Sequence, residues 1–540
     1  MIKGFRQIVA LTSLSRILGF IRDMSYGYFF GANAMLDAWL IAFKIPNLPR
    51  RLFGEGAASA SLIPVYSHEL HADKKRAEQL VNTVITVIFV ILAALVIIGE
   101  VAIWGYYALF SHTSETRLIL SLSGAMLPYA IFVCIAAVLG GVLNVHRHFA
   151  MPAAGPIVLN VLIICTIPLT GWAMKIPLKQ QLFFIAAAVL ISGVGQLIIL
   201  SAPLRASGVS IRPEWAVHTE AFKKILLMMG PMVLGLTVTQ INTLTDDIIA
   251  WCLSGSAEKG ATFTMLGHVI AYPLQRGSVS HLYYAQRLYQ LPLGIFGISL
   301  ATAIFPVMSH CAAQKDYARL AKSVSHGLAA TLFIALPSTI GLIAVATPLV
   351  SLILQRGQFS SADTAMVVWP LLCYTLGLCG YFAQQVMARA FYSMQDSRTP
   401  VKSALLAVVL NFILNITLVW SMGAGGLAIS TAICSYLQVV ILTILFQKWL
   451  HKQDTALSLW HGFGSETVKM ITASVCMVAA IAITMWLSKN WTAIFKLILV
   501  VPVSGGAYLL AAKILKIEML SLLTGRKTDN GKAEASVSFD

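Results

Sequence analysis

The sequence predicts an all-α, polytopic membrane protein with about 14 transmembrane helices, and three observations predict this fold class. The 540-residue chain is 58% hydrophobic and only 11% charged, a composition that soluble globular proteins do not have. Apolar runs of about 20 residues, the length needed to cross a bilayer, recur along nearly the whole chain. These runs lack the short alternating segments of a β-barrel, so we interpret them as helices.

The predicted spans follow one another with short connections. Six of them form a first group at 5–31, 34–66, 78–109, 117–146, 153–174 and 181–204. Six more follow at 221–254, 279–311, 317–354, 362–393, 399–421 and 425–447, and two end the series at 466–488 and 492–515. The first span contains charged residues and no small-residue cleavage site, so we expect no cleavable signal peptide. The polar residues 525–540 predict a disordered tail.

Charge is distributed unequally between alternate loops. One set of loops is rich in basic residues, for example Lys74–Arg76 and Arg205–Lys224, whereas the other set holds few. Basic loops stay in the cytoplasm, so we expect both termini to be cytoplasmic in the inner membrane of a bacterium. The net charge of +16 is therefore mainly a topology signal, and we expect no nucleic-acid partner.

An internal repeat predicts two lobes. "LIPVYSHELHADKKRAEQLV" at 62–81 is similar to "IFPVMSHCAAQKDYARLAKSV" at 304–324, and "VLNV" at 158–161 recurs as "VLNF" at 409–412. Six predicted spans separate the copies, so both copies have the same orientation, and we expect two pseudo-symmetric six-helix lobes with a cavity between them. The expected domains are an N-lobe (1–206), a C-lobe (207–450), a final helix pair (451–524) and the tail (525–540).

Arg16, Arg22, Arg50 and Arg287 all fall within predicted spans. A charged side chain at the bilayer centre costs roughly 2.5–3.5 kcal/mol on insertion scales, so these arginines must face water or partners. Asp23, Asp37, Lys44 and Glu55 lie on the first two spans and can supply such partners.

The stretch "FKIPNLPRRLFGEGAASASLIPVY" at 43–66 combines charge with helix breakers. Pro46 and Pro49 remove backbone donors, and irregular backbone at membrane depth is tolerated only where it is buried or lines a cavity. The planar guanidinium of arginine binds phosphate in a bidentate way. We therefore expect a kinked, cavity-lining helix and a phosphate or diphosphate substrate. The alternative is that these cations only pair with acids or reach the cytoplasmic interface.

A second polar group lies on later spans. Asp246 and Asp247 fall in the seventh span, Asn411 and Asn415 lie one turn apart on the eleventh, and Thr431 is on the twelfth. Oxygen ligands of this kind suit sodium or a proton. An inter-helix hydrogen-bond network without an ion is an equally good interpretation.

No catalytic constellation or nucleotide-binding loop is present, so the sequence predicts a protein that is not an enzyme and has no organic cofactor. The eight cysteines are scattered and form no CxxC motif. Their spacing indicates that most of them are packing residues and that they form neither a metal site nor a disulfide framework.

Four segments resemble the bacterial MurJ (MviN) lipid II flippases, within the superfamily of multidrug and oligosaccharidyl-lipid exporters. They are "SRILGFIRD" (15–23), "DAWLIAFKIPNLPRRLFGEGAASASLIPVY" (37–66), "YYAQRLYQLPLGIFGISLATAIFPVMS" (283–309) and "AFYSMQDSRTPVKSALL" (390–406). The resemblance covers almost the whole chain. It implies 14 helices, with the last two forming a groove for lipid tails. It also implies transport of the undecaprenyl-diphosphate-linked peptidoglycan precursor from the cytoplasmic to the periplasmic leaflet by alternating access.

The resemblance also implies site residues. Arg16, Arg22, Arg50 and Arg287 match the essential cavity arginines of the family, and further motif matches fall on Lys44, Asp37, Glu55 and Ser280. Some family members bind sodium, and the matching positions here are Asp246, Asn411, Asn415 and Thr431. The expected partners are the lipid-linked substrate and membrane lipid, and we expect a monomer.

The chain departs from the family pattern at three places. Gln286 precedes Arg287 where the family often has an acid, which leaves Arg287 more available to substrate. Asn415 stands where sodium-binding members carry an acid, which weakens the ion site. Residues 255–278 form an external insertion where a short turn is expected, and a lid, a partner surface or a passive loop are the alternatives.

The leading function is therefore a lipid-linked oligosaccharide flippase that supports cell-wall synthesis. The alternative is a cation-coupled multidrug exporter of the same architecture, but exporters of organic cations favour acidic, aromatic cavities. The driving force is left open between sodium, protons and membrane potential.

Overall fold

The computed structural model describes residues 2–50, 58–110, 112–265, 267–460 and 463–520. It divides into two compact units. Unit 1 comprises residues 1–281 with 354–363, and unit 2 comprises 282–353 with 364–540. The predicted domain boundary at 206/207 is a different division of the chain, because the seventh span belongs to unit 1, and the predicted lobes stay a prediction.

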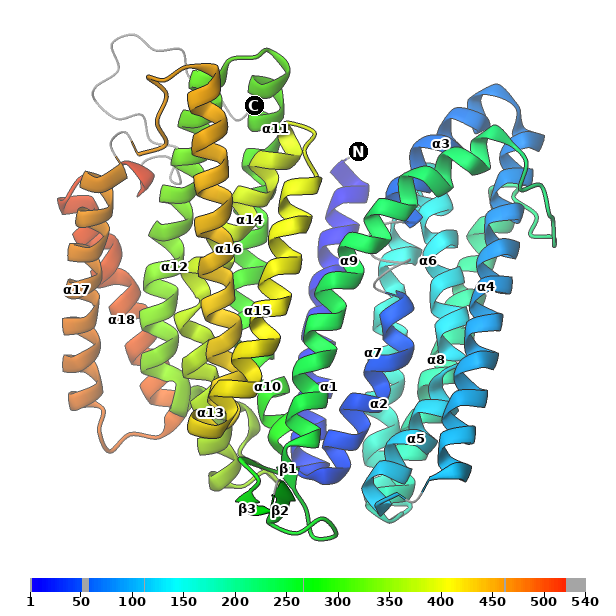
Figure 1. Cartoon of the computed structure of the whole chain (residues 1–540), viewed down its shortest axis with the longest axis horizontal. Helices are drawn as coiled ribbons and strands as arrows, with labels where there is room; N and C mark the ends of the chain where they lie inside the picture. Colours follow the sequence, from blue (N-terminus) through cyan, green and yellow to red (C-terminus); the bar gives the residue numbers. More distant parts are fainter. Residues whose placement is uncertain (1, 51–57, 111, 266, 461–462, 521–540) are drawn as a thin grey trace. The chain divides into compact units, whose positions relative to one another are not determined.

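Unit 1 is a bundle of long helices with one small β-structure (Figure 1). Its helices are α1 (Ile2–Phe30), α2 (Ala34–Pro49), α3 (Ala58–Ala72), α4 (Lys74–Leu109), α5 (Ser114–Met126), α6 (Tyr129–Val145), α7 (Ala150–Pro168) continued by the π-turn Leu169–Ala173, α8 (Leu178–Ala206) and α9 (Glu220–Cys252). Helix α1 packs on α7, and α6 packs on α8.

Short strands follow α9 and interrupt an otherwise helical fold. They are β1 (Ser254–Gly255), β2 (Thr262–Met265), β3 (His268–Ala271) and β4 (Leu274–Gln275). Strands β2 and β3 form an antiparallel hairpin, and β1 pairs with β4 in parallel. The insertion predicted at 255–278 is thus a folded β-structure.

Unit 2 is also helical. Helix α10 (Ser278–Pro292) begins in unit 1 and continues through the π-turn Leu293–Gly297 into α11 (Ile298–Ala313). The remaining helices are α12 (Tyr317–Leu354), α13 (Ser361–Leu376), α14 (Leu378–Ser393), α15 (Arg398–Met422), α16 (Ala424–Gln453), α17 (Phe463–Leu487) and α18 (Ala493–Ile514). One core joins α11, α12, α14 and α16 around Met308 and Phe446. A second core packs α17 and α18 on α12, where the Tyr508 hydroxyl donates to the Phe333 carbonyl (2.9 Å).

Helices long and apolar enough to span a membrane are numerous. Within the described residues, nine helices qualify by length and composition, or up to eleven if each of two bent pairs is one span. The bent pairs are α5 with α6 (41°) and α13 with α14 (44°). The other three predicted spans fall on α1, on α2 with α3, and on α9, which carry Arg16, Arg22, Lys44, Asp246 and Asp247. The multi-span helical fold is confirmed, whereas the count of 14 is not.

The order of elements supports the predicted repeat. Helix α3 contains Pro64 and leads through a short connection into the long α4, just as α11 contains Pro306 and leads into the long α12. One bent pair follows each long helix. The two similar sequence segments therefore occupy equivalent places in two similar series of helices.

Candidate functional site

Arg22 on α1 is held in a buried polar network of unit 1. Its Nε and Nη2 atoms donate to Asp23 Oδ1 (3.1 and 2.8 Å), and Nη1 donates to Asn160 Oδ1 on α7 (3.0 Å). Arg22 is 7% and Asp23 5% exposed. The Asn160 amide also donates to the Ser15 carbonyl (3.1 Å). Because a buried charge needs satisfied partners, this network fixes α1 against α7.

Arg16 lies on the same helix, next to Ser15, but its side chain is exposed. An exposed guanidinium on a membrane helix can present its donors to an anion. Arg16 is therefore better placed than Arg22 for direct contact with a ligand, and Arg22 is better placed to position α1.

Lys44 on α2 forms an ion pair with Asp247 on α9, and only 4% of the Asp247 side chain is exposed. The sequence predicts Lys44 at the substrate site and Asp247 in the polar group suited to sodium or a proton. The structure brings them together in one ion pair. Each charge offsets the free-energy cost that the other would have inside a membrane.

Asp37 and Ser280, two predicted site residues, contact each other. Asp37 Oδ2 accepts from the Gly277 amide (2.6 Å), and Oδ1 accepts from the Ser280 amide (2.7 Å) and hydroxyl (2.6 Å). Both residues are buried. A carboxylate that accepts from the first amides of a helix acts as an N-terminal cap, here supplied to α10 by another helix. Their geometry indicates a structural role.

Arg50 follows the end of α2 and is half-buried. Its Nε donates to Asn47 Oδ1 (3.2 Å), and the Asn47 amide donates to the Phe43 carbonyl (2.8 Å). Helix α2 includes Pro46 and ends at Pro49. Glu55, the remaining predicted site residue of this stretch, lies outside the described residues.

Arg287 belongs to unit 2, on α10, and is half-buried. Its Nη2 donates to the Tyr283 hydroxyl (3.1 Å), and its guanidinium lies 5.0 Å from the centre of the Tyr283 ring. The preceding Gln286 donates to the Tyr374 hydroxyl (3.0 Å). An aromatic partner leaves the positive charge of Arg287 less neutralised than a carboxylate would.

The predicted ion group is divided between the units. In unit 2, the Asn415 amide donates to Asn411 Oδ1 (2.9 Å), and the Asn411 amide donates to Thr431 Oγ1 (3.3 Å). Asp246 lies in unit 1 and is buried. The described residues contain no cluster of three or more His, Cys, Asp or Glu side chains suited to a metal ion. The hydrogen-bond chain supports the network interpretation, and the sodium prediction stays untested.

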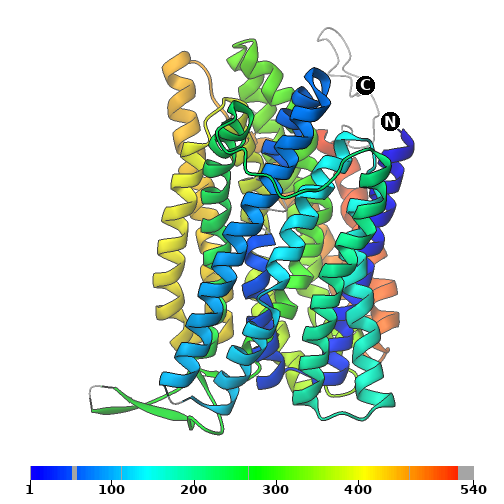
Figure 2. The ribbon, with the colours of Figure 1, turned by 90° about the vertical axis from the view of Figure 1, so that its right-hand side faces the viewer.

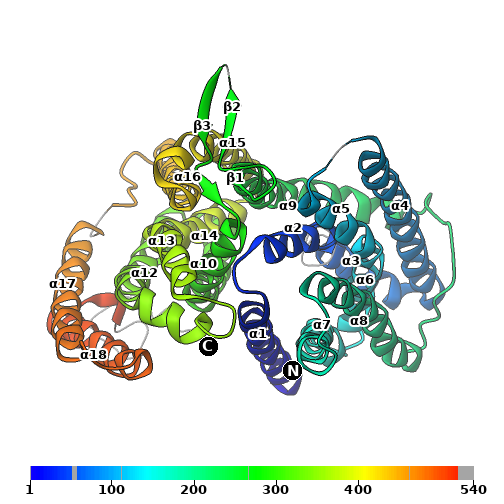
Figure 3. The same ribbon diagram turned by 90° about the horizontal axis from the view of Figure 1, so that it is seen from below.

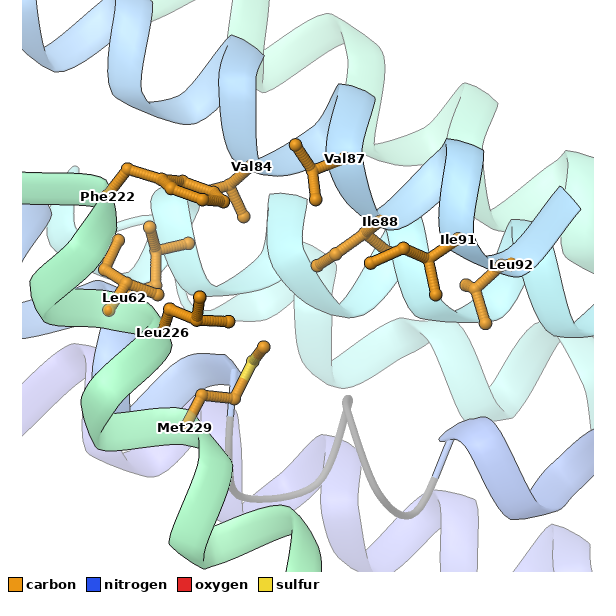
Figure 4. Close-up of a pocket in the computed structure, with 10 residues that line it drawn as sticks. Leu62, Val84, Val87, Ile88, Ile91, Leu92, Phe222, Leu226 and Met229 are labelled. Carbon is orange, nitrogen blue, oxygen red and sulfur yellow. The ribbon is translucent and has the colours of Figure 1, made fainter. Parts of the chain in front are cut away.

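A pocket of about 50 Å³ lies between α3, α4 and α9 of unit 1 (Figure 4). Its lining is wholly apolar: Leu62, Val84, Val87, Ile88, Ile91, Leu92, Phe222, Ile225, Leu226 and Met229. This pocket offers no partner for a phosphate, so the polar residues of α1 and α2 are the stronger candidates for an anion site.

The sequence did not predict a partly buried ion pair in unit 1, between Arg276 of the β-structure and Glu115 on α5. Arg276 Nε donates to Glu115 Oε2 (2.9 Å), Nη1 donates to the Trp251 carbonyl (2.7 Å), and the guanidinium lies 3.6 Å from the Trp251 ring. The only sequence signal was a charge in a loop that has few charges. Asn160 was not predicted as a site residue, although it is the asparagine of the repeated segment "VLNV" at 158–161 and corresponds there to Asn411 of "VLNF".

A family model described as "Lipid II flippase MurJ" matches residues 26–504. A relative from Vibrio cholerae, named a probable lipid II flippase MurJ, is 32% identical over 451 residues, which is 81% of each chain. A relative from Burkholderia cenocepacia, named lipid II flippase MurJ, is 29% identical over 453 residues, with 82% of this chain and 83% of the relative covered.

Two solved structures show similarity of fold. One is a lipid II flippase MurJ in an inward closed conformation, with a TM-score of 0.74, 23% identity, and 95% of this chain and 99% of that chain covered. The other is an inward-facing multidrug transporter of the MATE family, with a TM-score of 0.65, 12% identity, and 84% and 99% covered.

Proposed function

The chain belongs to the lipid II flippase MurJ family, and we propose that it moves lipid II from the cytoplasmic to the periplasmic leaflet by alternating access. The family match extends over most of the chain. Arginines at membrane depth on α1 and α2, with another on α10, supply charges that suit the diphosphate of an undecaprenyl-linked precursor. No bond is made or broken in such a transfer, so the protein acts as a transporter and not as an enzyme.

The observation that carries this proposal is the contrast between Arg16 and Arg22. Arg22 is neutralised by Asp23, whereas Arg16 on the same helix is exposed. A membrane helix tolerates an exposed guanidinium where water or an anionic ligand meets it. Arg16, Arg50 and Arg287 then bind the diphosphate, and Arg22 positions the helix that carries Arg16.

Complementation of cells depleted of their own flippase tests these roles. Arg16→Ala and Arg287→Ala should abolish growth at normal membrane abundance, and Arg16→Lys should recover only part of it because a lysine cannot form the bidentate contact. Arg22→Ala should instead reduce the abundance of the protein, because it removes the buried hydrogen bonds that Arg22 donates to Asp23 and Asn160. Full growth with Arg16→Ala and Arg287→Ala at wild-type abundance would contradict the substrate roles.

Multidrug export is the second candidate function, and its support is the similarity of fold to MATE transporters. Sequence identity at this level is evidence for fold alone. The cationic side chains oppose it, because like charges repel an organic cation.

We also propose that coupled sodium binding supplies the driving force for this transport. Asp246 would supply the charge, and Asn411, Asn415 and Thr431 would supply neutral oxygens. Asp246→Asn should change the dependence of transport on sodium or membrane potential more than lipid binding. Identical sodium and potential dependence in the variant and the parent would remove the coupling role.

The protein is a multi-pass membrane protein, and we place it in the bacterial inner membrane with both termini cytoplasmic, as a monomer. The distribution of basic residues among the loops supports this orientation. In this orientation, the ends of α4 and α9 at Leu109 and Cys252 face the periplasm.

A further inference from the structure

The β-structure after α9 has no part in the proposed transport, and we call residues 254–277 the external arm. Its base is fixed to unit 1 by two carboxylate contacts. Glu258 Oε2 accepts from the Ser114 amide at the start of α5 (2.7 Å), and Arg276 pairs with Glu115 (2.9 Å). Hydrogen bonds from the side chain and backbone of Ser114 lower the pKa of Glu258. The Glu258 carboxylate is therefore ionised at neutral pH and can accept these hydrogen bonds. The base of the arm is thus a defined structure.

Beyond the base, the arm consists of a hairpin whose two faces differ. The register pairs Phe263 with Ile270 and Thr264 with Val269, and residues directly opposite each other share a face of the sheet. One face carries Phe263 and Ile270 together with Tyr272, whose ring lies 4.9 Å from that of Phe263. The other face carries Thr264 and Val269, and Val269 is 72% exposed.

The hairpin carries no formal charge, since residues 260–275 contain no Lys, Arg, Asp or Glu. A surface that docks a soluble protein normally has a polar, charged rim that sets orientation and specificity. Aromatic and aliphatic side chains combined with threonine are instead suited to the headgroup region of a bilayer, where rings with a polar tip concentrate.

The direction of the arm agrees with that setting. Figures 1 and 2 show the hairpin at the end of unit 1 where α4 ends and α5 begins, extending sideways across the direction of the helix axes. Figure 3, along the helices, shows the strands lengthwise and confirms this direction. The arm starts two residues after Cys252, the last residue of α9. In the proposed orientation, a segment that leaves α9 at its external end and runs across the helix axes would lie parallel to the membrane surface.

A two-stranded hairpin is at best marginally stable in water, so a surface to pack on would stabilise it. We propose that the external arm is a membrane-interface anchor, in which β2 and β3 lie in the headgroup region of the outer leaflet and contact phospholipid. This anchor would fix the external ends of α5 and α9 relative to the bilayer while other helices move.

Photo-crosslinking tests the anchor in the full-length protein, reconstituted in vesicles of phosphatidylethanolamine and phosphatidylglycerol. The photoreactive residue p-benzoylphenylalanine replaces Val269 in the hairpin. Matched positions are Ile98, a 64% exposed residue of α4 that is expected to face lipid, and Ala257, an exposed residue at the base of the arm. Mass spectrometry should detect lipid adducts at position 269 with a yield close to that at position 98 and several-fold above that at position 257.

The same substitution in intact cells identifies a protein partner if one exists. A yield of lipid adduct at position 269 no higher than at position 257 would overturn the anchor, as would protein adducts in place of lipid adducts in cells. A periplasm-specific reporter inserted at Gly267 must also be active, and its inactivity would contradict the external position. None of these readouts depends on lipid II transport, so the anchor and the proposed function can fail separately.

Discussion

At the scale of single residues, charges in the predicted spans are compensated in different ways, and we propose that this difference separates structural from substrate roles. Asp23 neutralises Arg22, and Asp247 pairs with Lys44. Arg287 has an aromatic partner, and Arg16 is exposed. Burial and ion pairing therefore mark Arg22 and Lys44 as cations that hold helices together.

The Lys44–Asp247 pair provides a stability test. Lys44→Met removes the cation that pairs with the buried carboxylate of Asp247, and we expect a loss of about 3 kcal/mol, at the low end for buried pairs because Lys44 is partly exposed. The double variant Lys44→Met/Asp247→Leu removes both charges and should recover most of the loss. The midpoint of thermal unfolding in detergent measures each variant, and losses that simply add in the double variant would contradict the pairing.

At the scale of elements, the start of α10 is held by α2. Gly277 has a positive φ of 98°, and its amide donates to Asp37. A Cβ atom at this position would lie 2.5 Å from the Ala32 carbonyl oxygen. The turn before α10 therefore requires glycine both for its conformation and for the close approach of another backbone.

Gly277→Ala should destabilise the protein by at least about 2 kcal/mol, because it combines left-handed strain with overpacking. Gly267→Ala is the matched control, since Gly267 also has a positive φ (81°) but has no atom within 4 Å of an added Cβ. Thermal unfolding of the two variants compares them directly. Equal losses would show that the contact with the Ala32 carbonyl has no energetic weight.

The elements also show what sequence reasoning could and could not predict. Apolar length predicted most of the helices, because lipid imposes a simple rule on the length of each span. The motif at 37–66 identified Asp37, but its partner Ser280 is 243 positions away, and spacing along the chain cannot predict such a contact. The same limit applies to Asn160 with Arg22. The hairpin was missed because its strands are short and its alternation is weak.

At the scale of the whole molecule, two similar series of helices carry arginines at membrane depth on α1, α2 and α10. The repeat in the sequence, the two bent helix pairs and the family membership are consistent with a transporter built from duplicated bundles. We propose that the arginines bind the diphosphate of the substrate.

Leaflet accessibility of lipid II tests the central claim most directly. Cells depleted of their own flippase would express the wild-type chain or the Arg16→Ala/Arg287→Ala double variant at matched membrane levels, and a periplasmic reagent that modifies only externally exposed lipid II would report its leaflet. The account predicts that the wild-type chain restores externally accessible lipid II, whereas with the double variant lipid II accumulates in the cytoplasmic leaflet. Accessible lipid II at the depleted level with the wild-type chain, or at the wild-type level with the double variant, would contradict it.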